Sequence, residues 1–350
     1  MTLKAYSPQF SIARFILIVC VVYVHVPLPE IGPGMSDYDL LLPIRIASET
    51  LFRFSVLALT AISGFLFFFT NADQTPRATI IKKIKTLLIP FAFWNFSLVF
   101  VMWAGQTTGL ISGTRINLAD GDARVWMNAL FALEGRPVNY PLYFLRDLFI
   151  ISCLAVSGGR IFRKAPLAFF CLTALIAEYN LDGPLILRSP MLPCFVLGAV
   201  IARWGASLNS IKEQTVPFSI SLILACSVKY VYPSQIASYY VAVLGTCTVW
   251  IISGKLAESR YCESLVKLSR YSFPIFLMHG GMLFLAIEMG LDVQPNVNGI
   301  LQWIVVPPFL IVLCVIAFSI GSQIAPSAFS FVTGGRSHTK GGGSKETLFS

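Results

Sequence analysis

Charged residues are scarce in this sequence. Only 12% of its 350 residues are Asp, Glu, Lys or Arg, whereas 56% are hydrophobic. Because an ordinary soluble domain carries about 25% charged residues, this composition excludes the soluble globular class and favours a protein that crosses a membrane several times. Successive spans pack into one bundle, so we expect one membrane domain over residues 1–333 instead of soluble domains of about 150 residues each.

Familiar catalytic and metal-binding motifs are also missing. The sequence contains no GxSxG, no HExxH, no Walker loop and no GxGxxG after a predicted strand. It has no CxxC pair and no cluster of Cys and His, which argues against a metal site or a disulfide framework. Cys262 lies in a polar loop, whereas the other cysteines lie in apolar runs, where they behave as small hydrophobic residues: Cys20, Cys153, Cys171, Cys194, Cys226, Cys247 and Cys314.

Long apolar runs, in contrast, are abundant. A helix needs about 20 apolar residues to cross the hydrocarbon core. The first run is preceded by Lys4 alone and is followed by no small-residue cleavage site, which indicates a retained span and not a signal peptide. The sequence therefore predicts an all-α bundle of about ten transmembrane helices, near residues 10–28, 51–70, 87–105, 141–157, 166–181, 185–203, 217–233, 236–253, 271–290 and 300–324.

Basic residues alternate between the two sides of this predicted bundle. One set of loops collects Lys and Arg, and the other set is acidic or mixed. Because cytoplasmic loops carry the excess of Lys and Arg, both termini are predicted to face the cytoplasm. This distribution accounts for most of the net charge of +9 without a nucleic-acid partner. The Gly- and Ser-rich residues 334–350 are predicted to form a disordered cytoplasmic tail.

Ionisable residues inside the predicted spans are the candidates for a functional site, because each is costly in a membrane unless it faces the bundle interior. Arg14 and His25 on the first span are 11 residues apart, which is three turns plus about 20° of helix and about 16 Å along the axis. They therefore share one helix face. Alternatively, Arg14 reaches lipid headgroups and His25 is a hydrogen-bonded helix-end residue.

The second span carries two further groups of candidates. Glu49 and Arg53 are spaced i and i+4 in its outer half, which also suits a simple helix-start ion pair. Ser63, Gly64 and Phe65 lie deeper. Here glycine lets either a ligand or a neighbouring helix approach the backbone.

The fourth span places Arg146 and Asp147 at the depth predicted for His25. A carboxylate that accepts a hydrogen bond from one imidazole nitrogen fixes the tautomer and leaves the other nitrogen as a base, so Asp147 is a candidate for that role. The alternative is a buried structural ion pair. Arg188, at the outer start of a later span, adds positive charge to the same region. His279 lies about half-way along the ninth span, where either a structural or a direct role is open.

Five segments in order resemble the membrane acyltransferase family 3. They are R-x10-H on the first span, SGF on the second, the basic loop KKIKTLLIP, PLYFLRDL after a long outer loop, and SFPIFLMH near the end. YVHVP and FLRDLF are most similar to bacterial exopolysaccharide succinyl- and acetyltransferases of the succinoglycan succinyltransferase type. The basic loop departs from the family's R-x-x-R, because Lys83 stands at the first position and Thr86 at the second.

The resemblance implies a multi-pass enzyme of the bacterial inner membrane. It implies transfer of an acyl group from cytoplasmic acyl-CoA to a hydroxyl of a surface glycan or its lipid-linked precursor, with no tightly bound cofactor. His25 matches the family's essential histidine and Arg14 its paired arginine. Ser63, Gly64 and Phe65 match its second-span motif. The rival interpretations are a transporter or flippase for an anionic sugar or lipid, and a non-catalytic subunit of a polysaccharide machine.

The residue types suit this chemistry. A sugar hydroxyl needs a base such as His25 when it attacks a thioester, and the oxyanion needs donors, for which Arg53 and Arg146 are available. Glu49 and Arg188 are predicted to contact the substrate. The phosphates of CoA are expected to bind at the cytoplasmic end, through Arg14, Lys82, Lys83 and Lys85.

Overall fold

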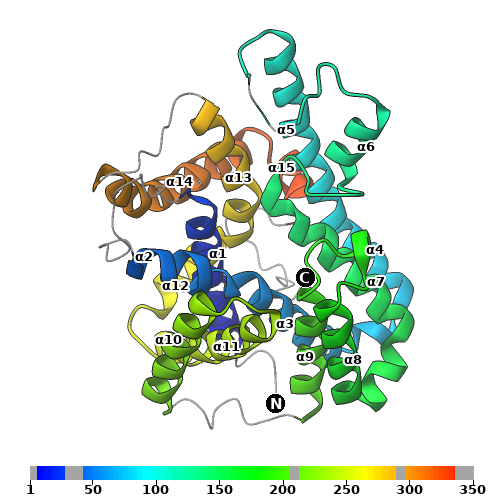
Figure 1. The fold of residues 1–350 in the computed structure, drawn as a ribbon, viewed down its shortest axis with the longest axis vertical. Coiled ribbons are helices and arrows are strands. Elements are labelled where there is room, and N and C mark those ends of the chain that lie inside the picture. The colour runs from blue at the N-terminus through cyan, green and yellow to red at the C-terminus, as the bar shows by residue number, and fades with distance from the viewer. Residues whose placement is uncertain are drawn as a thin grey trace.

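All regular secondary structure that the structure describes is helical (Figure 1). The computed structural model describes residues 6–27, 42–112, 114, 116–204, 213–288 and 297–335. The predicted all-α class is therefore confirmed over this part of the chain. The predicted disordered tail lies, apart from its first two residues, outside the described residues.

A helix occupies each of the ten apolar runs. These helices are α1 (Ser7–His25), α3 (Phe54–Phe69), α5 (Ile89–Thr107), α7 (Tyr143–Lys164), α8 (Pro166–Glu178), α9 (Met191–Trp204), α10 (Thr215–Val231), α11 (Gln235–Ala257), α13 (Ser272–Glu288) and α14 (Val297–Ile324). Short helices connect them: α2 (Leu42–Ile46), α4 (Pro76–Lys83), α6 (Ala123–Phe131), α12 (Cys262–Ser269) and α15 (Pro326–Val332), with π-helical turns η2 (Ala47–Leu51) and η4 (Ile84–Leu88) and 3-10 turns η3 (Ala72–Gln74), η5 (Tyr140–Leu142) and η6 (Gly183–Leu185).

The lengths of these helices support fewer membrane spans than ten. Within the described residues, six segments are long and apolar enough to cross a bilayer, and α12 with α13, bent by 52°, would make a seventh. Helices α8, α9 and α10 are apolar but have only 13, 14 and 17 residues, short of the roughly 20 that a perpendicular span needs. Ten spans and cytoplasmic termini therefore stay predictions.

Local sequence signals explain where several helices begin and end. Proline stands near the start of α1, α4, α5, α8 and α15, where its missing N–H costs nothing. Asp122 caps α6 by accepting a hydrogen bond from the Val125 N–H, and Ser234 caps α11 by accepting one from the Ala237 N–H. Helix α6 ends at Ala132, which adopts a left-handed conformation.

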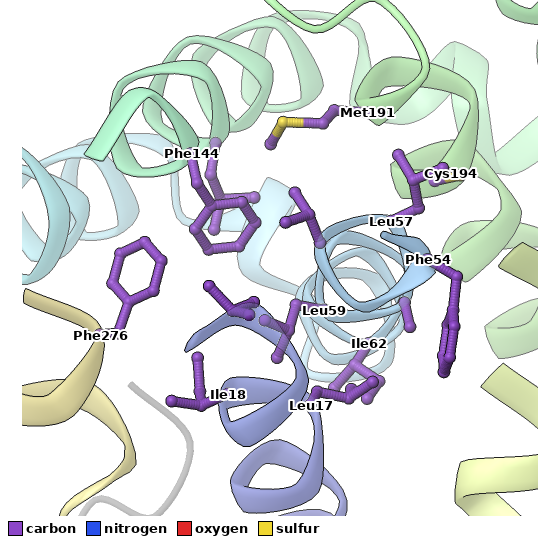
Figure 2. Packing of buried hydrophobic residues seen from close by; sticks show 14 of the residues in the cluster. Leu17, Ile18, Phe54, Leu57, Leu59, Ile62, Phe144, Met191, Cys194 and Phe276 are labelled. Carbon is purple, nitrogen blue, oxygen red and sulfur yellow. The ribbon is translucent and has the colours of Figure 1, made fainter. Parts of the chain in front are cut away.

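Helix α3 forms the centre of the bundle. Every residue of α3 except Ser63 and Phe69 is buried, as expected for a helix that is apolar on all sides. Figure 1 shows α1 and α3 near the middle, with α13 and α14 on one side and α7, α8 and α9 on the other. Figure 2 shows the side chains that meet around α3, from α1 (Leu17, Ile18), α7 (Phe144), α9 (Met191, Cys194) and α13 (Phe276).

Two glycines allow α3 and α9 to pack backbone against backbone. A Cβ atom on Gly64 would collide with the carbonyl oxygen of Phe195, and one on Gly198 would collide with backbone atoms of Ala61 and Phe65. Small residues are favoured at such crossings in membranes because they let helices approach closely. Gly64 therefore faces the α9 backbone, so close helix packing explains this residue better than the predicted approach of the acyl donor.

Replacing Gly64 with Ala is predicted to lower the free energy of unfolding by about 1–3 kcal/mol, because the added methyl group must push α9 away from α3. The measurement is reversible unfolding in mixed detergent. Gly281→Ala on α13 is the matched control, since a Cβ there would lie 3.9 Å from its nearest neighbours. Equal stability of the two variants would show that the α3–α9 contact is not close-packed.

Candidate functional site

His25 ends α1 with one ring nitrogen fixed and the other available. Its Nδ1 lies 2.7 Å from the carbonyl oxygen of Val21, one turn earlier on the same helix. A carbonyl only accepts, so Nδ1 must carry the hydrogen in this arrangement, and Nε2 then carries the lone pair. The ring is half-buried, and Nε2 has no hydrogen-bond partner among the described residues. In this arrangement Nε2 is the ring nitrogen that is open to a further partner.

A second histidine touches the first. His279 on α13 is fully buried, and its Nε2 lies 3.4 Å from Nδ1 of His25. The two ring centroids are 5.2 Å apart. Tyr140 of η5 packs edge-on to His25, with ring centroids 5.4 Å apart. His279, for which the sequence left both a structural and a direct role open, is therefore a neighbour of His25.

Two arginines lie near His25, and a lysine lies near those arginines. His25 lies within electrostatic range of the guanidinium groups of Arg53 and Arg188, and Lys229 on α10 lies within range of the same two arginines. Arg188 donates hydrogen bonds to the Tyr143 hydroxyl at 3.1 Å and to the Arg53 carbonyl at 3.5 Å. Over the described part of the chain, none of the three cations has a carboxylate partner. The site therefore carries uncompensated positive charge.

Arg146 and Asp147 form a buried ion pair on α7. Arg146 Nη1 lies 2.8 Å from Asp147 Oδ1, and the carboxylate is fully buried. Asp147 Oδ2 accepts a hydrogen bond from the Arg188 N–H at 3.0 Å. Arg146 donates to the carbonyl oxygens of Leu185 at 3.0 Å and Pro184 at 3.1 Å. The pair thus holds the connection between α8 and α9 and places Arg188.

These contacts favour one of the two roles predicted for the pair. Asp147 forms no hydrogen bond with His25; its carboxylate oxygens accept from the Arg146 side chain and from the backbone N–H of Arg188. The Val21 carbonyl and His279 occupy the position beside His25 Nδ1 that Asp147 was expected to take. Arg146 is committed to backbone carbonyls, so it is a poor candidate for an oxyanion donor. The structural ion pair, the alternative interpretation, describes these residues better.

The Glu49 and Arg53 side chains are both exposed, and they form no ion pair with each other. Glu49 lies on the π-helical turn η2 and Arg53 follows that turn, so the i, i+4 geometry of an α-helix does not apply. The Arg53 guanidinium is therefore not neutralised by Glu49, and its charge acts on His25.

The residues predicted to bind the donor lie on separate elements. Arg14 is half-buried on α1 and forms no hydrogen bond or ion pair with any described residue. Ser63 donates to the Leu59 carbonyl of its own helix at 2.8 Å. Phe65 lines an apolar cavity of about 70 Å³, together with Phe10, Ala13, Leu17, Ala61, Ile62, Ile201, Thr246, Cys247, Val249 and Trp250.

The basic loop is split between two short helical segments. Lys82 and Lys83 end α4, and Lys85 lies on η4. Lys82 and Lys85 are exposed and Lys83 is half-buried. Thr86 donates to the Lys82 carbonyl at 2.9 Å, so the residue at the second arginine position of the family motif stabilises the local backbone.

Sequence reasoning missed Lys229 and Tyr140. Lys229 was visible as a single charge in the apolar run 217–233, the same signal that identified Arg14. Tyr140 has no such signal, because an aromatic residue at the start of a span is common at membrane interfaces. Its place against His25 depends on the packing of η5, where Arg136 also stacks over the Tyr140 ring at 4.6 Å.

Comparison with known proteins identifies the class. Residues 8–321 match the acyltransferase 3 family, described as an acyltransferase domain, so the chain belongs to this family and the resemblance of its motifs is confirmed. The chain is 29% identical over 351 residues to the succinoglycan biosynthesis protein ExoH of Rhizobium meliloti (strain 1021), an alignment that covers 95% of this chain and 94% of that protein. No solved structure matches the chain. With its long apolar helices, the protein is a multi-pass membrane acyltransferase.

Arg146→Met is predicted to lower the free energy of unfolding by about 3–5 kcal/mol, because it leaves Asp147 buried without a counter-charge. The double variant Arg146→Met, Asp147→Leu should recover most of this loss, and unfolding in mixed detergent measures both. The control is Arg124→Met, which breaks an exposed ion pair with Glu134 and should cost no more than about 1 kcal/mol. Similar losses for Arg146→Met and Arg124→Met would contradict a structural role for the buried pair.

Proposed function

We propose that this protein transfers a short acyl group, succinyl or acetyl, from cytoplasmic acyl-CoA to a hydroxyl of an exopolysaccharide or its lipid-linked precursor on the outer side of a bacterial inner membrane. The family supports acyl transfer, and the relative named for succinoglycan biosynthesis supports a glycan acceptor. The apolar helices support a membrane location. The acyl-CoA donor and the direction of transfer are parts of the proposal.

The observation that carries this proposal is the state of His25. Its Nδ1 is fixed by the Val21 carbonyl at 2.7 Å, while Nε2 is unoccupied by any described residue. In the proposed reaction Nε2 takes the proton of the attacking hydroxyl as the new O–C bond forms. The C–S bond of the thioester then breaks, and the CoA thiolate takes the proton from the imidazolium. Such general-base catalysis contributes about 10²- to 10⁴-fold to a rate.

Arg53 and Arg188 are the proposed oxyanion donors. Both guanidinium groups lie within electrostatic range of His25. Pre-placed cations stabilise the charge that develops on the thioester oxygen without reorganising during the reaction. Glu49, exposed on η2, is proposed to contact hydroxyls of the acceptor.

The unpaired cations favour a succinyl over an acetyl group. Succinyl-CoA carries a free carboxylate at the end of its acyl chain, and this carboxylate needs a cationic partner when it leaves water. Lys229, half-buried on α10 near Arg188 and Arg53, is suited to that role. An acetyl group would leave this charge without a counterpart.

The nucleotide end of the donor is proposed to bind through Arg14, Lys82, Lys83 and Lys85. Lysine binds phosphate as a point charge, whereas arginine adds a bidentate fork. Arg14 has no ionic or hydrogen-bond partner among the described residues, so its guanidinium is available to an anion. The cavity lined by Phe65 is apolar, so its walls suit hydrocarbon better than the amides of a pantetheine arm.

His25→Ala is predicted to lower acyl transfer by at least about 100-fold while acyl-CoA binding is retained, because the imidazole moves a proton and is not part of the phosphate site. The assay follows radiolabelled acyl-CoA and purified protein with a glycan acceptor. His338→Ala in the tail is the matched control and should be fully active. A His25→Ala variant with more than about a tenth of wild-type turnover would remove His25 from the role of base.

Lys229→Met is predicted to raise KM for succinyl-CoA by about 10- to 100-fold, because a charge-assisted hydrogen bond is worth about 1.5–3 kcal/mol. KM for acetyl-CoA should be nearly unchanged. Lys255→Met, an exposed lysine near the end of α11, is the control. If both donors lose affinity equally in Lys229→Met, the lysine does not recognise the acyl carboxylate.

A further inference from the structure

The hydrogen positions on the two histidines follow from their acceptors. His279 Nδ1 lies 3.0 Å from the Ile275 carbonyl and 2.9 Å from the Phe276 carbonyl, both on its own helix. Two carbonyls facing Nδ1 require a hydrogen on that atom, so a neutral His279 carries its lone pair on Nε2. His279 Nε2 lies 3.4 Å from His25 Nδ1, and His25 Nδ1 carries the hydrogen that it donates to the Val21 carbonyl. Donor and acceptor therefore match across the contact.

We propose that His279 is a positioning residue for His25: its Nε2 accepts a second, shared hydrogen bond from the His25 Nδ1–H, which keeps the catalytic tautomer and stabilises the imidazolium formed during transfer. This inference rests on the proposed function, in which His25 is the base. The proton taken from the acceptor hydroxyl stays on His25 Nε2 until the CoA thiolate receives it. His279 remains neutral throughout.

A neutral acceptor suits this site better than a carboxylate. The groups that face His25 are His279 from α13, Tyr140 from η5, the Val21 carbonyl, and the charges of Arg53 and Arg188. A carboxylate here would pair with the arginines and cancel the positive charge proposed to stabilise the oxyanion. A buried carboxylate also carries a larger desolvation cost than an imidazole. His279 supplies an acceptor without either effect.

The packing of α13 holds the two rings at this separation. Gly280 follows His279 and lies directly against η5, since a Cβ there would be 2.6 Å from Pro141 Cδ and 2.7 Å from Asn139 Oδ1. The absent side chain lets α13 approach the turn that carries Tyr140. On the other side, His279 packs against Phe276 with ring centroids 5.9 Å apart. The ring has little freedom to rotate away from His25.

Steady-state kinetics of His279 variants test the proposal. His279→Leu fills the space but cannot accept a hydrogen bond, so kcat should fall about 10- to 100-fold with KM for both substrates within about twofold. His279→Gln offers an amide oxygen at similar reach and should recover most of kcat. Met278→Leu is the packing control on the same helix and should be fully active. A His279→Leu enzyme with more than half of wild-type kcat overturns the proposal.

Nitrogen-15 NMR of the imidazole rings tests the proposed tautomers in the wild-type protein, so the result does not depend on whether a His279 variant folds. The sequence has only three histidines, so the ring signals of full-length protein in nanodiscs can be assigned with His25→Gln and His338→Gln. Both His25 and His279 should be protonated at Nδ1 and bare at Nε2 near neutral pH. A wild-type His25 that carries its hydrogen on Nε2 overturns the proposal. If the proposed function is wrong and His25 is not the base, His25→Ala will remain active. That result is independent of the His279 variants, so the two failures can be told apart.

Discussion

Polar groups inside this bundle must find their partners within the protein, because hydrocarbon offers none. That constraint explains most of the buried polar contacts. Asp147 is buried only because Arg146 and the Arg188 N–H satisfy it. His25 and His279 direct Nδ1 to carbonyls of their own helices. Arg53, Arg188 and Lys229, which have no carboxylate partner among the described residues, are the groups that an anionic substrate would satisfy.

The buried ion pair connects fold and function. Arg146 binds the carbonyls of Pro184 and Leu185, and Asp147 binds the backbone of Arg188, so α7 fixes the connection that leads into α9. The glycine contact between α3 and α9 then sets the position of α9 against the centre of the bundle. Through these two contacts Arg188 reaches Tyr143 and the region of His25. The ion pair acts on the site by positioning it.

The sequence predicted the positions of the helices and some of the residues near His25. The apolar runs predicted all ten helices, because hydrophobic length is a local property. The ionisable residues in or beside them included His25, Arg53 and Arg188, which lie near one another in the structure. For Asp147 and Gly64 the contacts support the structural alternatives, an ion pair and close helix packing. Depth in a span says nothing about which side of α7 faces His25, and a glycine in a helix does not show whether a ligand or a helix approaches it. The π-helical turn η2, which carries Glu49 and changes its register with Arg53, has no clear sequence signal.

The contact between His25 and His279 was equally beyond the sequence, because it joins residues 254 positions apart through the packing of α13 on α1. Within the described residues, six or seven segments are long enough to cross a membrane, fewer than the ten predicted. Composition predicts a span wherever a run is apolar, but α8 and α9 are interrupted by turns before they reach full length. Helix length depends on where the chain turns, and the hydropathy of a run does not encode that point.

The most direct test of the account is transfer across a sealed membrane. Purified protein is reconstituted in one orientation, with radiolabelled succinyl-CoA added on the side of the lysines of α4 and exopolysaccharide repeat units enclosed on the other side. A transmembrane acyltransferase should release free CoA on the donor side and form an equal amount of succinylated glycan on the acceptor side. Passage of glycan or of intact acyl-CoA without release of free CoA would contradict it and would indicate a transporter.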